Sequence, residues 1–215
     1  MLLLSTKKLN KKFKYAFDKS EINFVEIPMI EKIAINYTWP EIKYGIIITS
    51  SYALKVLLKN NHQEKIKDFS FFCVGTSTKN RLAKLGLVIM ECESSAKNLA
   101  NKIKENYSNK TFTYFCGKQR LNTIEKTLKK STINVIFCEV YKTMLIPKKV
   151  KGKFDGVMFF SPSAVKSYAL INSFKNQKIF SWGNTTANEI KKYTSDFFVS
   201  KNPEIKSLIQ IIKNH

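Results

Sequence analysis

The chain has 215 residues, which is enough for one large domain or two small ones, and its hydrophobic fraction of 44% is that of an ordinary soluble protein. Lysine and arginine number 37 against 16 aspartates and glutamates, so the formal net charge is +21 and favours an anionic partner. No apolar run is long enough to span a bilayer, and we therefore expect a cytoplasmic protein without a membrane partner.

Residue types that carry metal, triad or nucleotide chemistry are scarce. The only histidines are His62 and His215, which argues against a histidine-based metal site or a catalytic triad. The four cysteines form no Cys-x-x-Cys pair and three of them lie in strand-like runs, so we expect buried thiols rather than zinc ligands or disulfides. Because a G-x-G-x-x-G loop is also missing, we expect neither a metal nor a cofactor.

The charge alone leaves nucleic acid open as a partner. Nucleic-acid sites rely on arginine and on exposed aromatic residues, whereas Arg81 and Arg120 are the only arginines here and the aromatic residues lie mainly in strand patterns. The lysines are accompanied by abundant isoleucine and asparagine, which indicates compositional drift. We therefore expect no nucleic-acid partner.

Strand-like and helix-like segments alternate through the first two thirds of the chain. Pro28 cannot donate to a strand ladder, so its strand should end there or lie at a sheet edge. Gly86 is expected just after the end of a helix. The expected strands are residues 2–4, 24–28, 46–48, 69–74, 87–92, 112–115 and 133–141, the helices are 8–19, 52–60, 78–85, 95–107 and 121–130, and residues 31–45 are irregular.

Two strand-turn-helix units follow in the C-terminal third. In the first, residues 154–160 form a strand, Ser161 is the expected N-cap and Pro162 the first helical residue. In the second, residues 178–182 form a strand, and the side chains in Gly183-Asn184-Thr185 are expected to cap the next helix. The unpaired N–H groups after such strands favour an anionic ligand. A short strand at 197–199 and a final helix opened by Asn202-Pro203-Glu204 complete the chain.

The two halves of the chain repeat one another. Ser50 precedes Ser161, and Gly75 precedes Gly183, by about 110 residues in comparable surroundings, which indicates an internal duplication. Residues 2–8 match 113–119, and residues 26–30 match 139–143, at a similar offset. Alternating strands and helices predict an α/β fold with parallel sheets flanked by helices, whose ligands collect at the carboxyl ends of the strands.

An ordered set of short motifs resembles the uroporphyrinogen-III synthase family. Each motif is weak by itself, but together they span essentially the whole chain in the family's order and spacing. They are Thr49-Ser50, Val74-Gly75-x-x-Thr78, Cys116-Gly117, Val140-Tyr141-x-Thr143, Phe160-Ser161-Pro162-Ser163-Ala164 and Gly183-Asn184-Thr185-Thr186-Ala187.

This resemblance implies two α/β domains, joined by a two-stranded connector, with the site in a cleft that opens and closes. Residues 1–28 plus 144–215 would form one domain and 32–138 the other, with connector strands at about 26–30 and 139–143. The implied reaction is that of a lyase in tetrapyrrole and haem biosynthesis. It cyclises the linear polycarboxylate hydroxymethylbilane with inversion of the last pyrrole and loss of water, and we expect a monomer.

The resemblance also assigns roles to individual residues. Tyr141 matches a tyrosine placed near the departing hydroxyl and is the expected general acid, although a packing role for it is equally open. Lys79 and Trp182 depart from the family pattern and put local packing or substrate grip in question. The expected substrate-binding residues are Thr49, Ser50, Gly75, Thr76, Thr78, Gly117, Ser161, Ser163, Lys178, Gly183, Asn184 and Thr185. The alternative is a non-catalytic two-domain α/β module that binds an anionic small ligand.

Overall fold

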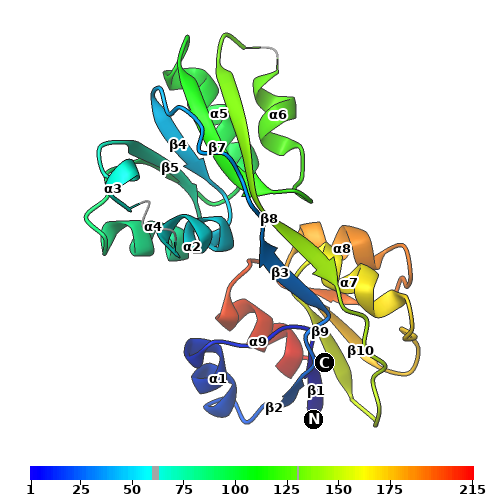
Figure 1. Cartoon of the computed structure of the whole chain (residues 1–215). Helices are drawn as coiled ribbons and strands as arrows, with labels where there is room; N and C mark the ends of the chain where they lie inside the picture. The colour runs from blue at the N-terminus through cyan, green and yellow to red at the C-terminus, as the bar shows by residue number, and fades with distance from the viewer. Residues whose placement is uncertain (60–62, 130) are drawn as a thin grey trace. The chain divides into compact units, whose positions relative to one another are not determined.

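The computed structural model describes residues 1–59, 63–129 and 131–215, and the chain divides into two compact units (Figure 1). Unit 1 contains residues 1–31 and 144–215, and unit 2 contains residues 32–143. The predicted helix end at Asn60, the histidine His62 and the predicted helix end at Lys130 lie outside the described residues. Among the helices that are described, none has the length and hydropathy that a membrane crossing needs.

The described residues of unit 1 form a five-stranded sheet in the order β11-β10-β9-β1-β2, and every pair of neighbours is parallel. Leu3, Met158 and Phe180 point to one face, in a core shared with α1 and α9. Leu4 and Ile179 belong to the opposite core, which is shared with α7 and α8. The elements are β1 (Leu2–Ser5), α1 (Lys11–Asp18), β2 (Asn23–Glu26), β9 (Gly156–Phe159), α7 (Pro162–Ala169), β10 (Lys178–Ser181), α8 (Asn184–Ile190), β11 (Phe198–Val199) and α9 (Ile205–Lys213).

The described residues of unit 2 form a six-stranded sheet in the order β3-β8-β7-β4-β5-β6. Its strands from β8 to β6 pair in parallel, and apolar side chains fill both faces. The elements are β3 (Ile30–Ala34), β4 (Gly45–Ile48), α2 (Ser51–Lys59), α3 (Gln63–Ile66), β5 (Ser70–Val74), α4 (Thr76–Ala83), β6 (Ile89–Glu93), α5 (Ala96–Asn106), β7 (Thr111–Gly117), α6 (Thr123–Leu128) and β8 (Asn134–Leu145).

The two sheets share one strand order. Unit 1 reads β11-β10-β9-β1-β2, and unit 2 reads β6-β5-β4-β7-β8 before β3 is added at its edge. The landmarks matched in the sequence therefore fall on strands in equivalent places: β4 corresponds to β9, β5 to β10 and β7 to β1. This correspondence confirms the predicted α/β fold with parallel sheets and supports the internal repeat.

Several local predictions are confirmed by hydrogen bonds and backbone angles. Ser161 caps α7 by accepting a bond from the N–H of Ala164, and Pro162 is the first helical residue. Gly86 has a φ of 70°, as a glycine after a helix end requires. β2 is an edge strand, and Ile27 and Met29 donate to the chain around β1 on either side of Pro28.

Other local predictions are wrong. Residues 31–45 are not wholly irregular, because β3 lies beside β8. The side chains of Asn184 and Thr185 do not cap α8, since the residue at its N-cap is Gly183 and no side-chain bond is made there. The last helix begins at Ile205 with Glu204 at its N-cap, so Pro203 lies before the helix rather than in its first turn.

Candidate functional site

The carboxyl ends of the strands in unit 2 bring together most of the residues predicted there. Thr49 and Ser50 follow β4, and Gly75 separates β5 from α4. Gly117 ends β7, which pairs with β4 on the side away from β5. Parallel strands end at the same edge of a sheet, so these turns are neighbours and expose backbone N–H groups and hydroxyls. Thr76 and Thr78 lie in the first turn of α4, where Thr76 is exposed and Thr78 is buried.

Tyr141 reaches this edge from β8. Its phenol donates a hydrogen bond to Ser50 Oγ at 3.1 Å, and its ring meets the ring of Tyr52 edge-on at a centroid distance of 5.1 Å. The residue is 9% exposed. Gly117 pairs with it in the ladder after an irregularity in the register, and a Cβ at Gly117 would lie 2.5 Å from Tyr141 Cζ. The phenol therefore occupies space that only a glycine leaves open.

Burial raises the pKa of Tyr141, and its hydrogen bond to Ser50 offsets that rise only in part. The phenol is therefore protonated near neutral pH, which is the form that a proton donor needs. Tyr114 lies on the same edge and shares a hydrogen bond of 2.6 Å with Thr49. Burial raises the pKa of Tyr114 to about 12. Sequence reasoning placed Tyr114 only in a strand, since nothing in its neighbourhood shows that its hydroxyl meets Thr49.

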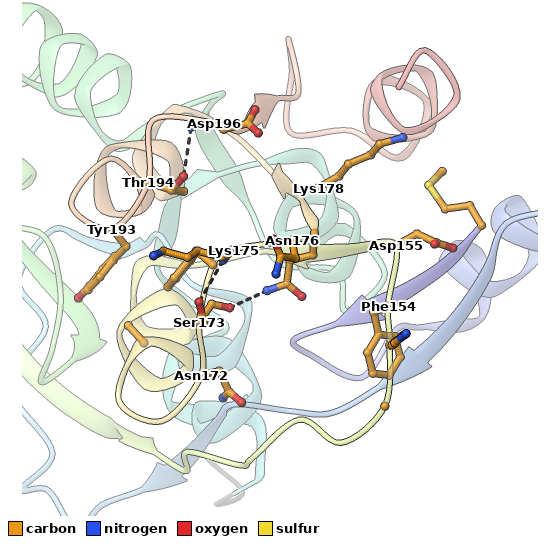
Figure 2. A pocket seen from close by; sticks show the side chains of 16 residues that line it. Phe154, Asp155, Asn172, Ser173, Lys175, Asn176, Lys178, Tyr193, Thr194 and Asp196 are labelled. Atoms are coloured by element: carbon orange, nitrogen blue, oxygen red, sulfur yellow. Dashed lines mark hydrogen bonds between the residues drawn. The ribbon is translucent and has the colours of Figure 1, made fainter.

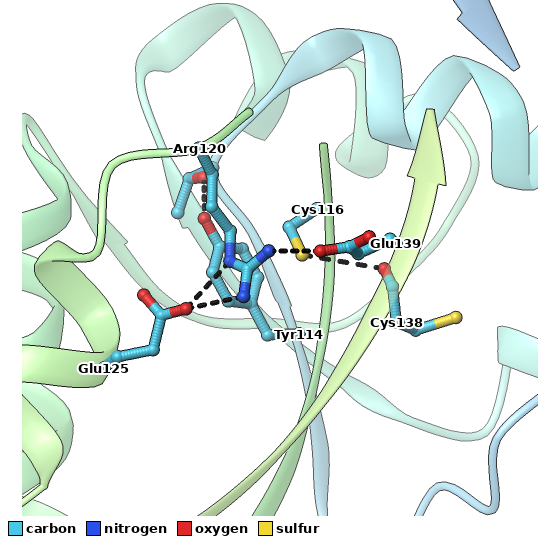
Figure 3. A network of polar contacts seen from close by, with 7 residues as sticks. Tyr114, Cys116, Arg120, Glu125, Cys138 and Glu139 are labelled. Carbon is cyan, nitrogen blue, oxygen red and sulfur yellow. Dashed lines mark hydrogen bonds and ion pairs between the residues drawn. The ribbon is translucent and has the colours of Figure 1, made fainter. Parts of the chain in front are cut away.

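The turn after β7 is fastened to β8 by contacts that the sequence did not reveal, and Figure 3 shows the one between Arg120 and Glu139. Lys118 N–H donates to the carbonyl of Tyr141 at 2.8 Å, and Gln119 Oε1 accepts from Thr143 N–H at 2.8 Å. Arg120 donates through Nη1 to Glu139 at 2.8 Å. These three bonds hold the backbone on which Gly117 and Tyr141 face one another.

Arg120 also donates through Nε and Nη2 to Glu125 Oε1 at 2.9 and 2.6 Å, and thereby ties the turn to α6. Burial acts to lower the pKa of Arg120, but the hydrogen bonds to Glu139 and Glu125 outweigh that effect and hold the pKa above its usual value. The second oxygen of Glu125, Oε2, is buried and makes no hydrogen bond. Arg120 is therefore the main compensation for the charge on Glu125.

In unit 1, two of the predicted turns meet at the carboxyl ends of the adjacent strands β9 and β10. Ser161 and Ser163 follow β9, where both are half-buried. Gly183, Asn184 and Thr185 follow β10, and Asn184 and Thr185 are exposed. Their amide and hydroxyl groups are open to a ligand, because neither side chain is used as a helix cap.

Trp182, which departs from the family pattern, has a defined aromatic environment. Its ring lies 5.3 Å from the ring of Phe13 and 5.6 Å from that of Phe160, measured between centroids. The Lys7 ammonium lies 4.0 Å from the Phe160 centroid and 5.5 Å from that of Trp182. The large ring is therefore accommodated between α1 and the end of β9. Lys79, the other departure, is exposed, so its side chain takes no space in the core.

Lys178 is not brought together with these turns. It is the first residue of β10, at the amino end of the strand, and its ammonium donates to the carbonyl of His215. There it borders an open hollow of about 1650 Å³ that is also lined by Asp155, Lys175 and Asp196 (Figure 2). This hollow thus lies at the edge of the sheet opposite to Ser161 and Gly183.

Comparisons with known proteins bear on the family and the fold of the chain. The family model described as uroporphyrinogen-III synthase HemD matches residues 11–210. The structure is similar to uroporphyrinogen-III synthetase from Helicobacter pylori, with a TM-score of 0.70, 15% identity and coverage of 99% of this chain and 98% of that one.

A mutant uroporphyrinogen III synthase from Thermus thermophilus is also similar, with a TM-score of 0.63 and 11% identity over 100% of this chain and 98% of that one. At these identities the solved structures establish the fold alone. No curated protein sequence was matched. The family model covers nearly the whole described chain and confirms the resemblance seen in the motifs, and on that match the chain belongs to the uroporphyrinogen-III synthase family.

Proposed function

We propose that this enzyme carries out its family's reaction as a cytoplasmic, monomeric lyase, in which hydroxymethylbilane is cyclised with inversion of the last pyrrole ring and loss of water. The match of the family model to residues 11–210 carries this proposal. The geometry supports it, since hydroxyls and backbone N–H groups gather at the carboxyl ends of the strands in each unit, where carboxylates bind well.

For this reaction the protein needs only to position the substrate and donate one proton. Protonation of the terminal hydroxyl releases water and leaves an electrophilic carbon on the first ring. The substituted carbon of the last ring attacks it and forms a spiro intermediate, which breaks and recloses in the inverted sense with loss of a ring proton. Because electrophile and nucleophile both belong to the substrate, catalysis comes from folding the chain and stabilising charge.

We assign the proton donor to Tyr141, and the binding of the substrate's carboxylates to the hydroxyls and backbone of the turns. In unit 2 these are Thr49, Ser50, Gly75, Thr76, Thr78 and Gly117, and in unit 1 Ser161, Ser163, Gly183, Asn184 and Thr185. Lys178 is left out of this set, because it starts β10 at the other end of the strand. We further propose that residues 1–28 plus 144–215 and residues 32–138 are the two domains, connected through 26–30 and 139–143.

The function is tested by the isomer that forms. Hydroxymethylbilane closes spontaneously to the type I ring, so purified protein should change the product to the type III isomer, as resolved by chromatography after oxidation to porphyrins. A product ratio that stays at the spontaneous value would reject the proposal. Stabilisation of the protein by the bilane without any change of isomer would instead identify the non-catalytic module.

Replacing Tyr141 by phenylalanine should lower kcat by about 100-fold, at the low end of the range for general acids, because a phenol is a weak acid near neutral pH. The loss of its hydrogen bond to Ser50 should destabilise the fold by only about 1 kcal/mol. Initial rates of type III formation and thermal unfolding measure the two effects.

The matched control is Tyr168→Phe, which removes another buried phenol in unit 1, whose hydroxyl accepts a hydrogen bond from Gln177 and donates one to the carbonyl of Ser173. It should lose a similar amount of stability and keep its turnover. A Tyr141→Phe enzyme as fast as the wild type would remove Tyr141 from its proposed role and leave it as a packing residue.

A further inference from the structure

Lys32 lies beside the proposed proton donor. It belongs to β3, and its ammonium nitrogen is 5.3 Å from the ring centroid of Tyr141 and 5.7 Å from that of Tyr52. The hydroxyl of Tyr52 donates to the backbone carbonyl of Lys32, which fixes the strand against the first turn of α2. One cation is therefore held over the two tyrosine rings that neighbour Ser50.

Within the described residues, no carboxylate forms an ion pair with this lysine. The ion pairs formed within the described ranges involve Lys14, Lys43, Lys67, Arg120 and Lys192, and Lys32 takes part in none of them. Arg120, in the turn after β7, is the contrast, since two glutamates share its guanidinium. Burial of the ammonium lowers the pKa of Lys32, so its surroundings solvate the charge less well than water does.

A poorly solvated cation beside aromatic rings has more to gain from an incoming anion than a lysine surrounded by water. The residue as a whole is exposed, so a ligand can reach it. The hydroxyls and backbone groups of the neighbouring turns are neutral donors, which bind carboxylates without offsetting their charge. At the carboxyl ends of the strands in unit 2, Lys32 can therefore pair with an anionic group of a ligand next to the phenol of Tyr141.

We propose that Lys32 binds a carboxylate of the substrate and so places the departing hydroxyl against Tyr141. This inference rests on the proposed function and adds a cationic anchor to it. Lys32 contributes to substrate binding, so its removal weakens the enzyme–substrate complex. Proton transfer is still carried out by the phenol of Tyr141.

The test compares Lys32→Gln, Lys32→Arg and Lys55→Gln. Lys55 is the matched control, because its ammonium lies 5.8 Å from the Tyr52 ring and shows no contact with Tyr141. The probe is a polycarboxylate bilane that lacks the terminal hydroxyl and so cannot cyclise, and its Kd is measured by quenching of intrinsic fluorescence. Lys32→Gln should raise Kd by roughly tenfold, as expected for a lost charge-assisted hydrogen bond, whereas Lys55→Gln should match the wild type.

Lys32→Arg should keep the affinity and extend it to higher pH. Because the pKa of Lys32 is lowered, the wild type should lose affinity at a pH where an ordinary lysine is still charged, while arginine keeps its charge throughout. With the true substrate, Lys32→Gln should raise KM more than it lowers kcat. Thermal unfolding verifies that each variant is folded.

The outcomes separate this inference from the function on which it rests. An equal bilane Kd for wild type and Lys32→Gln overturns the role of Lys32, even if the wild type forms the type III isomer. If the wild type binds the bilane through Lys32 without changing the isomer, the binding role of Lys32 is supported and the proposed enzymatic function is rejected. A fall in kcat alone, with Kd unchanged, also rejects binding by Lys32.

Discussion

Replacement of Gly117 by alanine should displace the Tyr141 phenol, lower kcat by at least tenfold and destabilise the fold by about 1–3 kcal/mol. The added Cβ would lie 2.5 Å from Cζ and 2.8 Å from the hydroxyl oxygen of Tyr141, which is closer than real Cβ contacts come. The ring cannot move freely, since Tyr141 packs in the core of unit 2 and is bonded to Ser50. Type III formation and thermal unfolding measure the two losses.

Two controls locate the origin of these losses. Gly183→Ala adds a methyl group after β10, where the nearest heavy atom is Pro203 Cβ at 3.9 Å, so its stability should stay at the wild-type value. In a Tyr141→Leu background the stability penalty of Gly117→Ala should shrink, because the two side chains no longer compete for the same space. Wild-type turnover and stability in Gly117→Ala would show that the phenol does not need its observed position.

The strands and turns of this fold are readable in the sequence where a local pattern determines them. The apolar runs before Ser161 and Gly183 are buried on both faces, so short continuous runs bounded by caps identified β9 and β10. β3 was missed because the residues from Glu31 to Ala34 are exposed on both faces, so no buried face marks it, and it becomes a strand only through its position beside β8. Pairing with a segment a hundred residues away leaves no local signal.

In the candidate site, too, the sequence identified residues with a local pattern and missed those that depend on tertiary contacts. The motifs identified the turn residues, since caps and glycines are recognised from the neighbouring sequence. They also grouped Lys178 with these residues, although it starts β10 and so lies about 10 Å from the carboxyl end of that strand. Lys32, Tyr114 and Arg120 were missed because each acquires its partner from another strand or helix. The clash that makes Gly117 necessary also depends on the β7–β8 register.

Replacement of Arg120 by methionine should destabilise unit 2 by about 1–3 kcal/mol, because it leaves two carboxylates without their charged partner. The loss should stay below that of a fully buried pair, since the side chains of Arg120, Glu125 and Glu139 are 19%, 25% and 38% exposed. Glu125 contributes most of it, because its second oxygen is already buried without a hydrogen bond. Chemical denaturation of the full chain measures the change.

The source of this loss can be separated from the loss of packing against Phe137, on whose ring the guanidinium lies at 5.0 Å. Changing Glu125 and Glu139 to glutamine in the Arg120→Met background should recover part of the stability, since it removes the unpaired charges and keeps the shape. If the triple variant is no more stable than Arg120→Met, packing rather than charge holds the turn after β7. In that case only the backbone bonds of Lys118 and Gln119 would fix the register between Gly117 and Tyr141.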